Sequence, residues 1–372
     1  MHDAYARGDP NRGAHEPPRD SMEISVGQAV ELIGVENAGL DITGQRGIVT
    51  EVPGHGLVSV KIDGSGSSVS VWPEQLKILR ETAPSAPKTL PTAHADAFTS
   101  VPYAGNPACV VLLPKGRAVA EAWMAQVADE MHLSETAYLV PRDEPSNYDL
   151  RWFTPASEVD LCGHATLASS HVLWDVHGVD ASAPLRFHTK SGVLCAARDA
   201  SGFIELDFPS EPAQAVAADD ADRAQLLPSF GLKAEDVLWV GRNRMDLIAE
   251  VTPESFARLQ PSSSEIKKIA CRVLSVTAAG CPVPSGDDVA YDFSSRAFGP
   301  CVGIEEDPVC GSAHCCLGPY WRDKLGGKAE LQARAASPRG GHVRVRFSEG
   351  RVLLGGRAMT TMTGELRHVT WR

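Results

Sequence analysis

The sequence predicts a protein of two or three domains, in which a small all-β unit precedes a larger α+β part with a duplicated half-domain. The length of 372 residues exceeds one average domain. Short alternating apolar runs between glycine turns occupy residues 24–79, whereas strand-like and helical runs are mixed from about residue 92 onwards. This larger part shows neither βαβ alternation nor a GxGxxG loop, which disfavours a Rossmann fold. Two distant segments that look alike suggest the duplication.

The N-terminal part divides into a tail, an all-β unit and a linker. Residues 1–22 are rich in proline, glycine and charge without hydrophobic periodicity, so we expect a disordered tail. Residues 23–80 contain alternating runs at 58–62 and 69–71, which predict β-strands. Residues 81–91, ETAPSAPKTLP, predict a proline-stiffened linker.

The segments GQRGIVTEV, LVSVKID and VWPEQLKIL follow one another in this all-β unit. In this order they resemble the small SH3-like or KOW-like barrels that are attached to larger proteins. Such barrels bind a protein partner or pack on their host. Trp72 is nearly alone as an aromatic residue here, so we favour packing, with partner binding as the alternative.

Three helices are expected in the larger part. Apolar spacing predicts the first over about residues 119–131, after which HLSETAYLV changes from a helical to a strand pattern. The other two are predicted over about 164–176 and 312–325. Each of these two helices begins in one of the look-alike segments.

The look-alike segments are CGHATLASSHVLW from Cys162 and CGSAHCCLGPYW from Cys310. Each opens with Cys-Gly, continues with small residues and ends on an aromatic residue, and an acid precedes each, Asp160 and Asp307. Glycine lets the backbone approach a ligand, and the free N–H groups of a helix start can hold an anion. Two such starts that face each other would clamp a carboxylate-bearing substrate.

The thiols of these segments are candidates for proton transfer. The positive end of a helix dipole lowers the pKa of a thiol at the helix N-terminus. We therefore expect Cys162 and Cys310 to suit chemistry in which one thiol takes and the other gives a proton at a carbon beside a carboxylate. The alternative is that both thiols fill tight helix contacts, as free cysteines often do.

Composition excludes several classes of function. A formal net charge of -12 argues against nonspecific attraction to nucleic acid or to an anionic membrane. The nine cysteines are odd in number and none has CxxC spacing, which favours reduced thiols and no structural zinc site. We find neither a run of about 20 apolar residues nor a signal-peptide h-region, so we expect a cytoplasmic protein.

Six motifs occur along the larger part: DAFTSVPYAGNPACVVLLP, HLSETAYLV, FTPASEVDLCGHATLASSHVLW, ELDFPSEP, DFSSRAFGPCVGIEEDPVCGSAHCCLGPYW and RGGHVRVRFSEGRVLLGGRAMTTMTGEL. Together they resemble the PhzF-like (phenazine biosynthesis-like) family, relatives of diaminopimelate epimerase and proline racemase. The resemblance implies two pseudo-symmetric halves, residues 92–213 with 358–372 and residues 214–357, each a β-sheet wrapped around a central helix. It also implies an active site between the halves, a homodimer, and no need for a metal, nicotinamide, flavin or pyridoxal phosphate.

The resemblance further implies roles for individual residues. Glu135 matches the acid–base carboxylate, and His164 and Asp307 match groups that orient the substrate and stabilise developing charge. The positions expected to bind the substrate are Asn106, Gly163, Gly311, Ser312 and Ala313. Cysteine at both helix starts departs from the phenazine enzyme itself and matches the epimerase and racemase relatives. The base is therefore open between Glu135 and the pair Cys162 and Cys310.

Three functions are compatible with these residues and motifs. The leading one is a cofactor-independent isomerase that moves a proton on a small carboxylate-containing metabolite, with Glu135 as the acid and base. The second is an epimerase or racemase that uses Cys162 and Cys310. The third is a non-catalytic scaffold that recruits a protein partner through its SH3-like barrel.

Overall fold

The structure is a computed structural model that describes residues 24, 26, 28–34, 36, 37, 40, 41, 43–53, 56–78, 87–217 and 220–371. The chain forms two compact units, Met1–Ala86 and Pro87–Arg372. The tail expected over residues 1–22 lies outside the described residues, as do residues 81–86 of the expected linker. In the part of the chain that the structure describes, no helix combines the length and apolarity needed to cross a membrane.

The first unit contains a five-stranded antiparallel sheet with the order β6-β5-β4-β1-β7. Alternate residues of its strands point inward, and the buried set consists of valine, leucine and isoleucine side chains. Gly47 is required where β4 crosses β5, because a Cβ there would lie 2.5 Å from the carbonyl oxygen of Lys61. The strands of this unit are β1 (Ala29–Leu32), β2 (Glu36–Asn37), β3 (Leu40–Asp41), β4 (Arg46–Glu51), β5 (Val58–Ile62), β6 (Ser68–Val71) and β7 (Leu76–Ile78).

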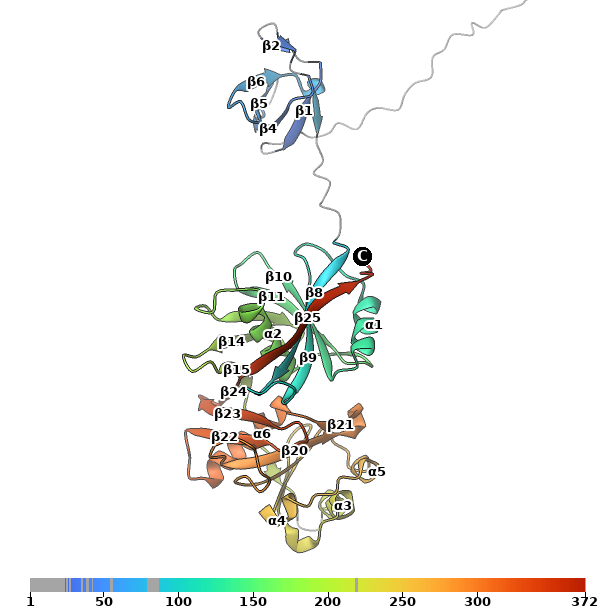
Figure 1. Ribbon diagram of the computed structural model, residues 1–372, viewed down its shortest axis with the longest axis vertical. Helices are drawn as coiled ribbons and strands as arrows, with labels where there is room; N and C mark the ends of the chain where they lie inside the picture. Colours follow the sequence, from blue (N-terminus) through green and yellow to red (C-terminus); the bar gives the residue numbers. More distant parts are fainter. Residues whose placement is uncertain are drawn as a thin grey trace, which may run out of the picture. The chain divides into compact units, whose positions relative to one another are not determined.

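The second unit is a sheet-rich mixed fold with few helices (Figure 1). Its strands are hydrogen-bonded in a continuous order that closes on itself. They are β8 (Thr89–Ala97), β9 (Asn106–Leu112), β10 (Glu135–Pro141), β11 (Asn147–Phe153), β12 (Glu158–Val159), β13 (Leu185–Thr189), β14 (Gly192–Arg198), β15 (Ile204–Pro209), β16 (Gln214–Ala215), β17 (Val237–Arg242), β18 (Leu247–Val251), β19 (Leu274–Ala279), β20 (Phe293–Gly299), β21 (Ile304–Asp307), β22 (Glu330–Ala335), β23 (Gly341–Ser348), β24 (Arg351–Gly356) and β25 (Ala358–Arg367).

One pattern of strand pairing occurs twice in this unit. Strand β9 pairs in parallel with β10, β10 pairs antiparallel with β11, and β11 pairs in parallel with β13. The same order of pairings recurs later in the chain: β18 pairs in parallel with β19, β19 pairs antiparallel with β20, and β20 pairs in parallel with β22. A helix lies in the connection before the last strand of each set, α2 (Gly163–Asp175) in the first and α6 (Gly311–Lys324) in the second. The remaining helices are α1 (Glu121–Met131), α3 (Ala221–Phe230), α4 (Pro253–Phe256) and α5 (Ser263–Ile266), with short 3-10 turns at Pro73–Gln75, Ala234–Asp236 and Pro300–Val302.

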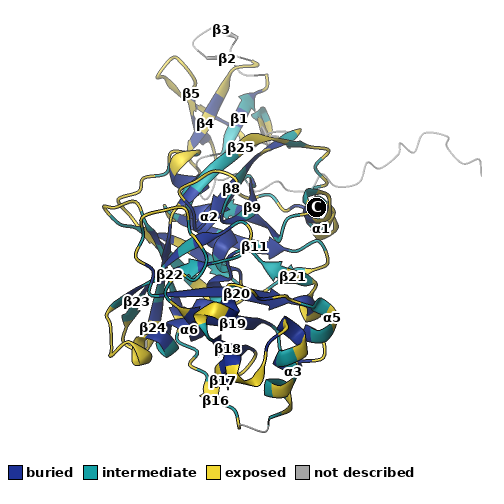
Figure 2. Ribbon diagram, turned by 60° about the horizontal axis from the view of Figure 1, so that its bottom comes forward, coloured by how far each residue is buried: buried dark blue, intermediate teal, exposed yellow. Residues whose placement is uncertain are grey.

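Helix α2 packs against strands β8, β9, β10, β15 and β25, and Figure 2 shows it as one of the buried elements of the molecule. Ten of its 13 residues are buried, so its sequence is apolar or small on every face rather than amphipathic. The buried hydroxyl groups of Thr166 and Ser170 donate to carbonyl oxygens one turn earlier, at 2.5 and 2.8 Å. This local bonding satisfies the hydroxyl donors of these two residues inside the core.

Helix α6 is held in the same way by strands β23 and β24. Its Trp321 stacks on Phe293 with ring centroids 5.4 Å apart and donates its Nε1 hydrogen to Thr277 Oγ1 at 2.9 Å. Residues of both α2 and α6 belong to one hydrophobic core. The two helices are therefore fixed within a single packed interior.

The observed elements differ little from the sequence expectations. Helices α2 and α6 each begin one residue before the predicted start, and α1 begins two residues after it. Strand β8 begins at Thr89, inside the stretch expected to be linker, because Thr89–Ala97 pairs with the C-terminal strand β25. This pairing draws the last strand of the chain back beside the first strand of the second unit (Figure 1).

The close packing of β24 against α2 leads to a test of stability. A Cβ on Gly356 would overlap the ring of Phe98 and lie 3.0 Å from Leu167 Cδ1, and both side chains are fully buried. Gly356→Ala should therefore lower the free energy of unfolding by about 1–3 kcal/mol. The matched change Gly364→Ala, at an exposed position with its nearest neighbour at 4.0 Å, should change it by less than about 0.5 kcal/mol.

Urea unfolding followed by tryptophan fluorescence measures both variants, since six of the seven tryptophans lie in the second unit and one, Trp72, in the first. Equal unfolding midpoints for the two variants would contradict the packing described for Gly356.

Candidate active site

The starts of α2 and α6 meet at two glycines. A Cβ built on Gly163 would lie 3.8 Å from the Cα of Gly311, and the reverse distance is also 3.8 Å. Neither helix has an acidic residue in its first turn, so no carboxylate of that turn compensates the positive end of either dipole. A cavity of about 430 Å³ opens beside this junction and is lined by residues of both helix starts. Its size is within the range of sites for small molecules.

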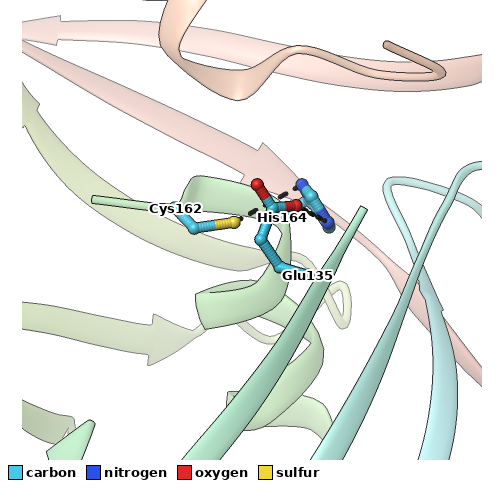
Figure 3. Close-up of side chains that lie close together, drawn as sticks. All are labelled: Glu135, Cys162 and His164. Carbon is cyan, nitrogen blue, oxygen red and sulfur yellow. Dashed lines mark hydrogen bonds and ion pairs between the residues drawn. The ribbon is translucent and has the colours of Figure 1, made fainter. Parts of the chain in front are cut away.

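Glu135, His164 and Cys162 lie close together (Figure 3), and all three line the cavity, where we call them the first wall. Glu135 is the first residue of β10, Cys162 is the residue before α2, and His164 is in the first turn of α2. The imidazole Nε2 of His164 lies 3.2 Å from Glu135 Oε2, and its Nδ1 lies 3.6 Å from the sulfur of Cys162. Glu135 Oε2 and His164 Nε2 are buried yet make no hydrogen bond of good geometry to the described residues. These two atoms therefore have unused hydrogen-bonding capacity.

Burial sets the protonation of this wall. Burial, together with the negative charge of Asp307, raises the pKa of Glu135 to about 8, against a smaller opposing effect of the hydrogen bond from Cys162. Burial lowers the pKa of His164 to about 3, so the imidazole is neutral at ordinary pH. The wall therefore presents a carboxylic acid that titrates near neutrality beside a neutral histidine.

The thiols differ from the sequence expectation. Burial raises the pKa of both Cys162 and Cys310 above the usual range. The charge of Asp307 raises both pKa values further, and that of Glu135 also raises the pKa of Cys162. The expected lowering by the helix dipole was wrong, because desolvation and two neighbouring carboxyl groups outweigh it. Both cysteines are free and line the cavity, but they are thiols rather than thiolates at neutral pH.

Asp307, the last residue of β21, lines the same cavity, and its charge acts on both Glu135 and Cys162. Burial raises its pKa, while hydrogen bonds from the Cys310 thiol, the Val309 N–H group and the Asn106 amide act in the other direction. Asn106 donates from Nδ2 to Asp307 Oδ1 at 2.7 Å and to the carbonyl oxygen of Val309 at 3.1 Å. The side chain of Asn106 thus holds the carboxyl group of Asp307 in place through a hydrogen bond.

Not every residue expected to bind substrate lines the cavity. Gly163, Gly311 and Ser312 do so, together with Asp160 at the mouth. Asn106 and Ala313 are not among the lining residues, and both are buried. For Asn106 the reason is its bonding to Asp307 and Val309, which holds the side chain away from the cavity.

Sequence reasoning missed a buried charge pair at the same cavity. Arg272 donates to Asp246 at 3.0 and 2.5 Å, and two of its nitrogens donate to Ser312 Oγ at 3.1 Å. Asp246 is 4 % exposed, so its carboxylate and the guanidinium are strongly coupled. The three residues are 26 and 40 positions apart in the chain, and no local pattern signals their contact. Arg272 thus places a half-buried cation at the start of α6.

The first wall could also hold a metal ion. One ligand atom each of Glu135, Cys162 and His164 lie within 4.8 Å of one another. A carboxylate, a thiolate and an imidazole are ligands that Zn²⁺ accepts in tetrahedral sites. Binding would require Glu135 and Cys162 to lose their protons, which their raised pKa values oppose.

The raised pKa of Glu135 predicts how stability depends on pH. In the folded protein this carboxyl keeps its proton up to about pH 8, but in the unfolded chain it loses the proton near pH 4.5. Between these values the unfolded state binds fewer protons, so rising pH lowers the free energy of unfolding. Glu135→Gln removes this effect. Relative to wild type, the variant should gain about 1 kcal/mol for each pH unit over this window.

Urea unfolding at a series of pH values from 5 to 8 measures the gain, with Glu365→Gln, at an exposed position on β25, as the charge-matched control. A difference between Glu135→Gln and wild type that stays constant with pH would show that the carboxyl titrates normally.

Comparison with known proteins agrees with this fold. The sequence model of the PhzC-PhzF family, described as phenazine biosynthesis-like protein, matches residues 95–364. An uncharacterised isomerase of Halalkalibacterium halodurans is 46% identical over 280 residues, which are 75% of this chain and 98% of that protein. The human phenazine biosynthesis-like domain-containing protein is 38% identical over 292 residues, 74% of this chain and 99% of the relative.

Solved structures resemble the second unit. A PhzF family protein of Enterococcus faecalis aligns with a TM-score of 0.66 and 36% identity, over 75% of this chain and 100% of that one. A protein of Pseudomonas aeruginosa described as a predicted epimerase shares the fold with a TM-score of 0.57 at 21% identity, over 74% of this chain and 99% of that one. The chain therefore belongs to the PhzC-PhzF family of phenazine biosynthesis-like proteins.

Proposed function

We propose that this protein is a cofactor-independent isomerase that moves a proton on a small carboxylate-containing metabolite, with Glu135 as the acid and base. The observation that carries the proposal is the buried carboxyl of Glu135, set against His164 in a cavity between two helix starts. The enzyme class rests on the relatives, because the curated proteins of H. halodurans and P. aeruginosa that match over most of their length are named isomerases. The chain is an isomerase of the same family.

Glu135 suits both halves of a proton transfer. A general base works best when its pKa lies near the operating pH, and the pKa of Glu135 is about 8. The group can therefore take a proton from carbon when ionised and return it to another position when protonated. His164 is neutral and lies 3.2 Å away, so it can donate a hydrogen bond to the substrate or to the carboxylate.

The helix starts suit the carboxylate of a substrate. Gly163 and Gly311 are the first residues of α2 and α6, and both line the cavity. The backbone N–H groups there form the positive ends of the two helix dipoles, which attract an anion. Ser312, held by Arg272, adds a hydroxyl at the start of α6. These donors would stabilise the charge that develops on the substrate during proton removal, and Asp307, which lines the same cavity, would orient the substrate.

A two-thiol epimerase remains the second candidate. Cys162 and Cys310 precede α2 and α6 in equivalent places and both line the cavity. Their raised pKa values make thiolate formation costly in the free enzyme, and for this reason we rank this candidate below the first.

The remaining expectations belong to the same proposal. The repeated strand pairing supports two pseudo-symmetric halves, with the pairing of β8 and β25 assigning the last strand to the first half. The five-stranded sheet of the first unit is consistent with an SH3-like barrel, and it lies outside the family match, which begins at residue 95. We propose that this barrel packs on its host or binds a protein partner, that the enzyme is a cytoplasmic homodimer, and that it binds neither nucleic acid nor membrane.

Solvent deuterium exchange tests the base. Small carboxylates that raise the unfolding temperature of Glu135→Gln identify bound candidates, since a ligand of the folded state stabilises it. Each hit is then incubated with wild type in D₂O, and deuterium incorporation is followed by proton NMR. Glu135→Gln should slow incorporation by about 10²–10⁴-fold, the usual contribution of a general acid or base. Cys162→Ser and Cys310→Ser should retain more than about a tenth of the wild-type rate.

Loss of exchange in both serine variants, with exchange preserved in Glu135→Gln, would replace the leading candidate by the two-thiol epimerase. No exchange on any bound carboxylate, together with a stoichiometric protein partner captured by the first unit, would favour the scaffold instead.

A chelator test addresses the metal alternative at the same wall. Because Glu135 and Cys162 hold their protons at neutral pH, exchange should be unchanged after EDTA treatment. Added Zn²⁺ should inhibit rather than activate, since it would occupy the lone pairs of Glu135 and His164. A rate that EDTA abolishes and Zn²⁺ restores would contradict a cofactor-independent reaction.

A further inference from the structure

A second cavity of about 480 Å³ lies in the second unit and shares no lining residue with the candidate active site. Its volume is in the range of small-molecule sites. It gathers loops from distant parts of the chain: the turn after β8, the turn before β15, the loop between β19 and β20, and the turns on either side of β23 and β24. Nothing in the proposed reaction uses these residues.

Two arginine–glycine motifs converge on this cavity. The segment RGGH at 339–342 begins β23, and the segment GGR at 355–357 ends β24. A Cβ on Gly341 or Gly356 would overlap neighbouring side chains, those of Val309 and Phe98 respectively. The glycines therefore allow the close packing that brings Arg339, His342 and Arg357 to one cavity, where Arg334 of β22 joins them.

Arg339 has a structural role. Its guanidinium donates to Asp96 Oδ1 at 2.8 Å and to the carbonyl oxygens of Gly105 and Ala104 at 2.8 and 3.0 Å. Asp96 is 3% exposed, so this charge is compensated inside the protein. Arg339 ties the turn after β8 to the turn before β23 and has little capacity left for a ligand.

Arg334 and Arg357 are different. Neither forms an ion pair with a carboxylate of the described residues. Arg357 donates one hydrogen bond, to the carbonyl oxygen of Ser201 at 2.7 Å, and its guanidinium lies 5.2 Å from the ring centroid of Phe203. Arg334 lies 6.0 Å from the ring centroid of Tyr291 and hydrogen-bonds the hydroxyl group of that residue. Its charge also helps to lower the pKa of Asp287. Each guanidinium carries five N–H donors, so most remain available.

One carboxylate lines the cavity, that of Asp287, and it is hydrogen-bonded to groups of its own loop. It accepts from Tyr291 Oη at 2.8 Å and from Ser285 Oγ at 2.9 Å, and the Val289 N–H group donates to it at 3.2 Å. Its oxygens are thus satisfied within its own loop. Arg334 and Arg357 thus line this cavity without an ion pair to a described carboxylate, in a chain whose net charge is -12.

We propose that this cavity binds a small metabolite through a phosphate or carboxylate group held by Arg334 and Arg357. The planar fork of a guanidinium matches the oxygens of both groups. The hydroxyl groups of Thr99 and Ser100 and the imidazole of His342 line the same space and can complete the contacts. Phe98 separates this site from the catalytic one: it lines the second cavity, while its ring would touch a Cβ on Gly311 at 3.8 Å.

Titration of the full chain with inorganic phosphate and with malonate, at constant ionic strength, tests the proposal by isothermal calorimetry. At least one anion should bind saturably, and binding of phosphate alone or of malonate alone distinguishes a phosphate ligand from a carboxylate ligand. The double variant Arg334→Gln/Arg357→Gln should weaken binding by about tenfold or more, as expected for lost charged hydrogen bonds. The double variant Arg186→Gln/Arg367→Gln removes the same charge from exposed strand positions and should bind as wild type does.

Three results would overturn the proposal. One is the absence of saturable binding of either anion to wild type. Another is binding that survives in Arg334→Gln/Arg357→Gln but is lost in Ser312→Ala, which would put the anion at the start of α6. The third is equal weakening in both arginine double variants. If the first double variant fails to fold, the single exposed change Arg357→Gln carries the same test.

Discussion

The contact of two helix starts at Gly163 and Gly311 is the constraint on which the candidate active site depends. A Cβ at either position would make van der Waals contact, at 3.8 Å, with the Cα of the other glycine, so the two helix starts pack directly on each other. The contact holds only because α2 and α6 are both fixed in one hydrophobic core by the strands around them. The residues just before and after the two glycines line the cavity beside this contact: Cys162, His164, Cys310 and Ser312.

Enclosure then decides the chemistry of that cavity. Water is displaced from Glu135, His164 and both thiols, and each group moves toward its neutral form: the acids hold their protons and the histidine loses its own. The wall near Glu135 is neutral at physiological pH, while Arg272 keeps its charge at the other wall because Asp246 compensates it. A substrate anion would meet uncompensated helix dipoles on both sides, with one titrating group within reach. This asymmetry makes a single carboxyl a better acid and base than two thiols.

The sequence predicts much of this arrangement, and its failures have physical causes. The repeated Cys-Gly segments located both helix starts within one residue, because small residues and glycine encode the close approach locally. The motifs also indicated Glu135, His164 and Asp307 as site residues, and all three line one cavity in the structure. The pKa of the thiols could not be read from the helix position alone, since desolvation depends on residues far away in the chain. The same holds for Arg272 and Asp246 and for the second cavity with Arg334 and Arg357, whose members meet only after the sheet has formed.

The proposed reaction depends above all on Glu135 being a buried carboxylic acid whose pKa lies near neutrality. Carbon-detected NMR of protein labelled at the glutamate side-chain carboxyl measures this pKa directly, with the resonance of Glu135 assigned from its absence in Glu135→Gln. We expect a titration midpoint of about 8, well above the ordinary value of 4.5. A midpoint near 4.5 would mean that the carboxyl is ionised and solvated in the folded protein, and it would remove the physical basis for Glu135 as both acid and base.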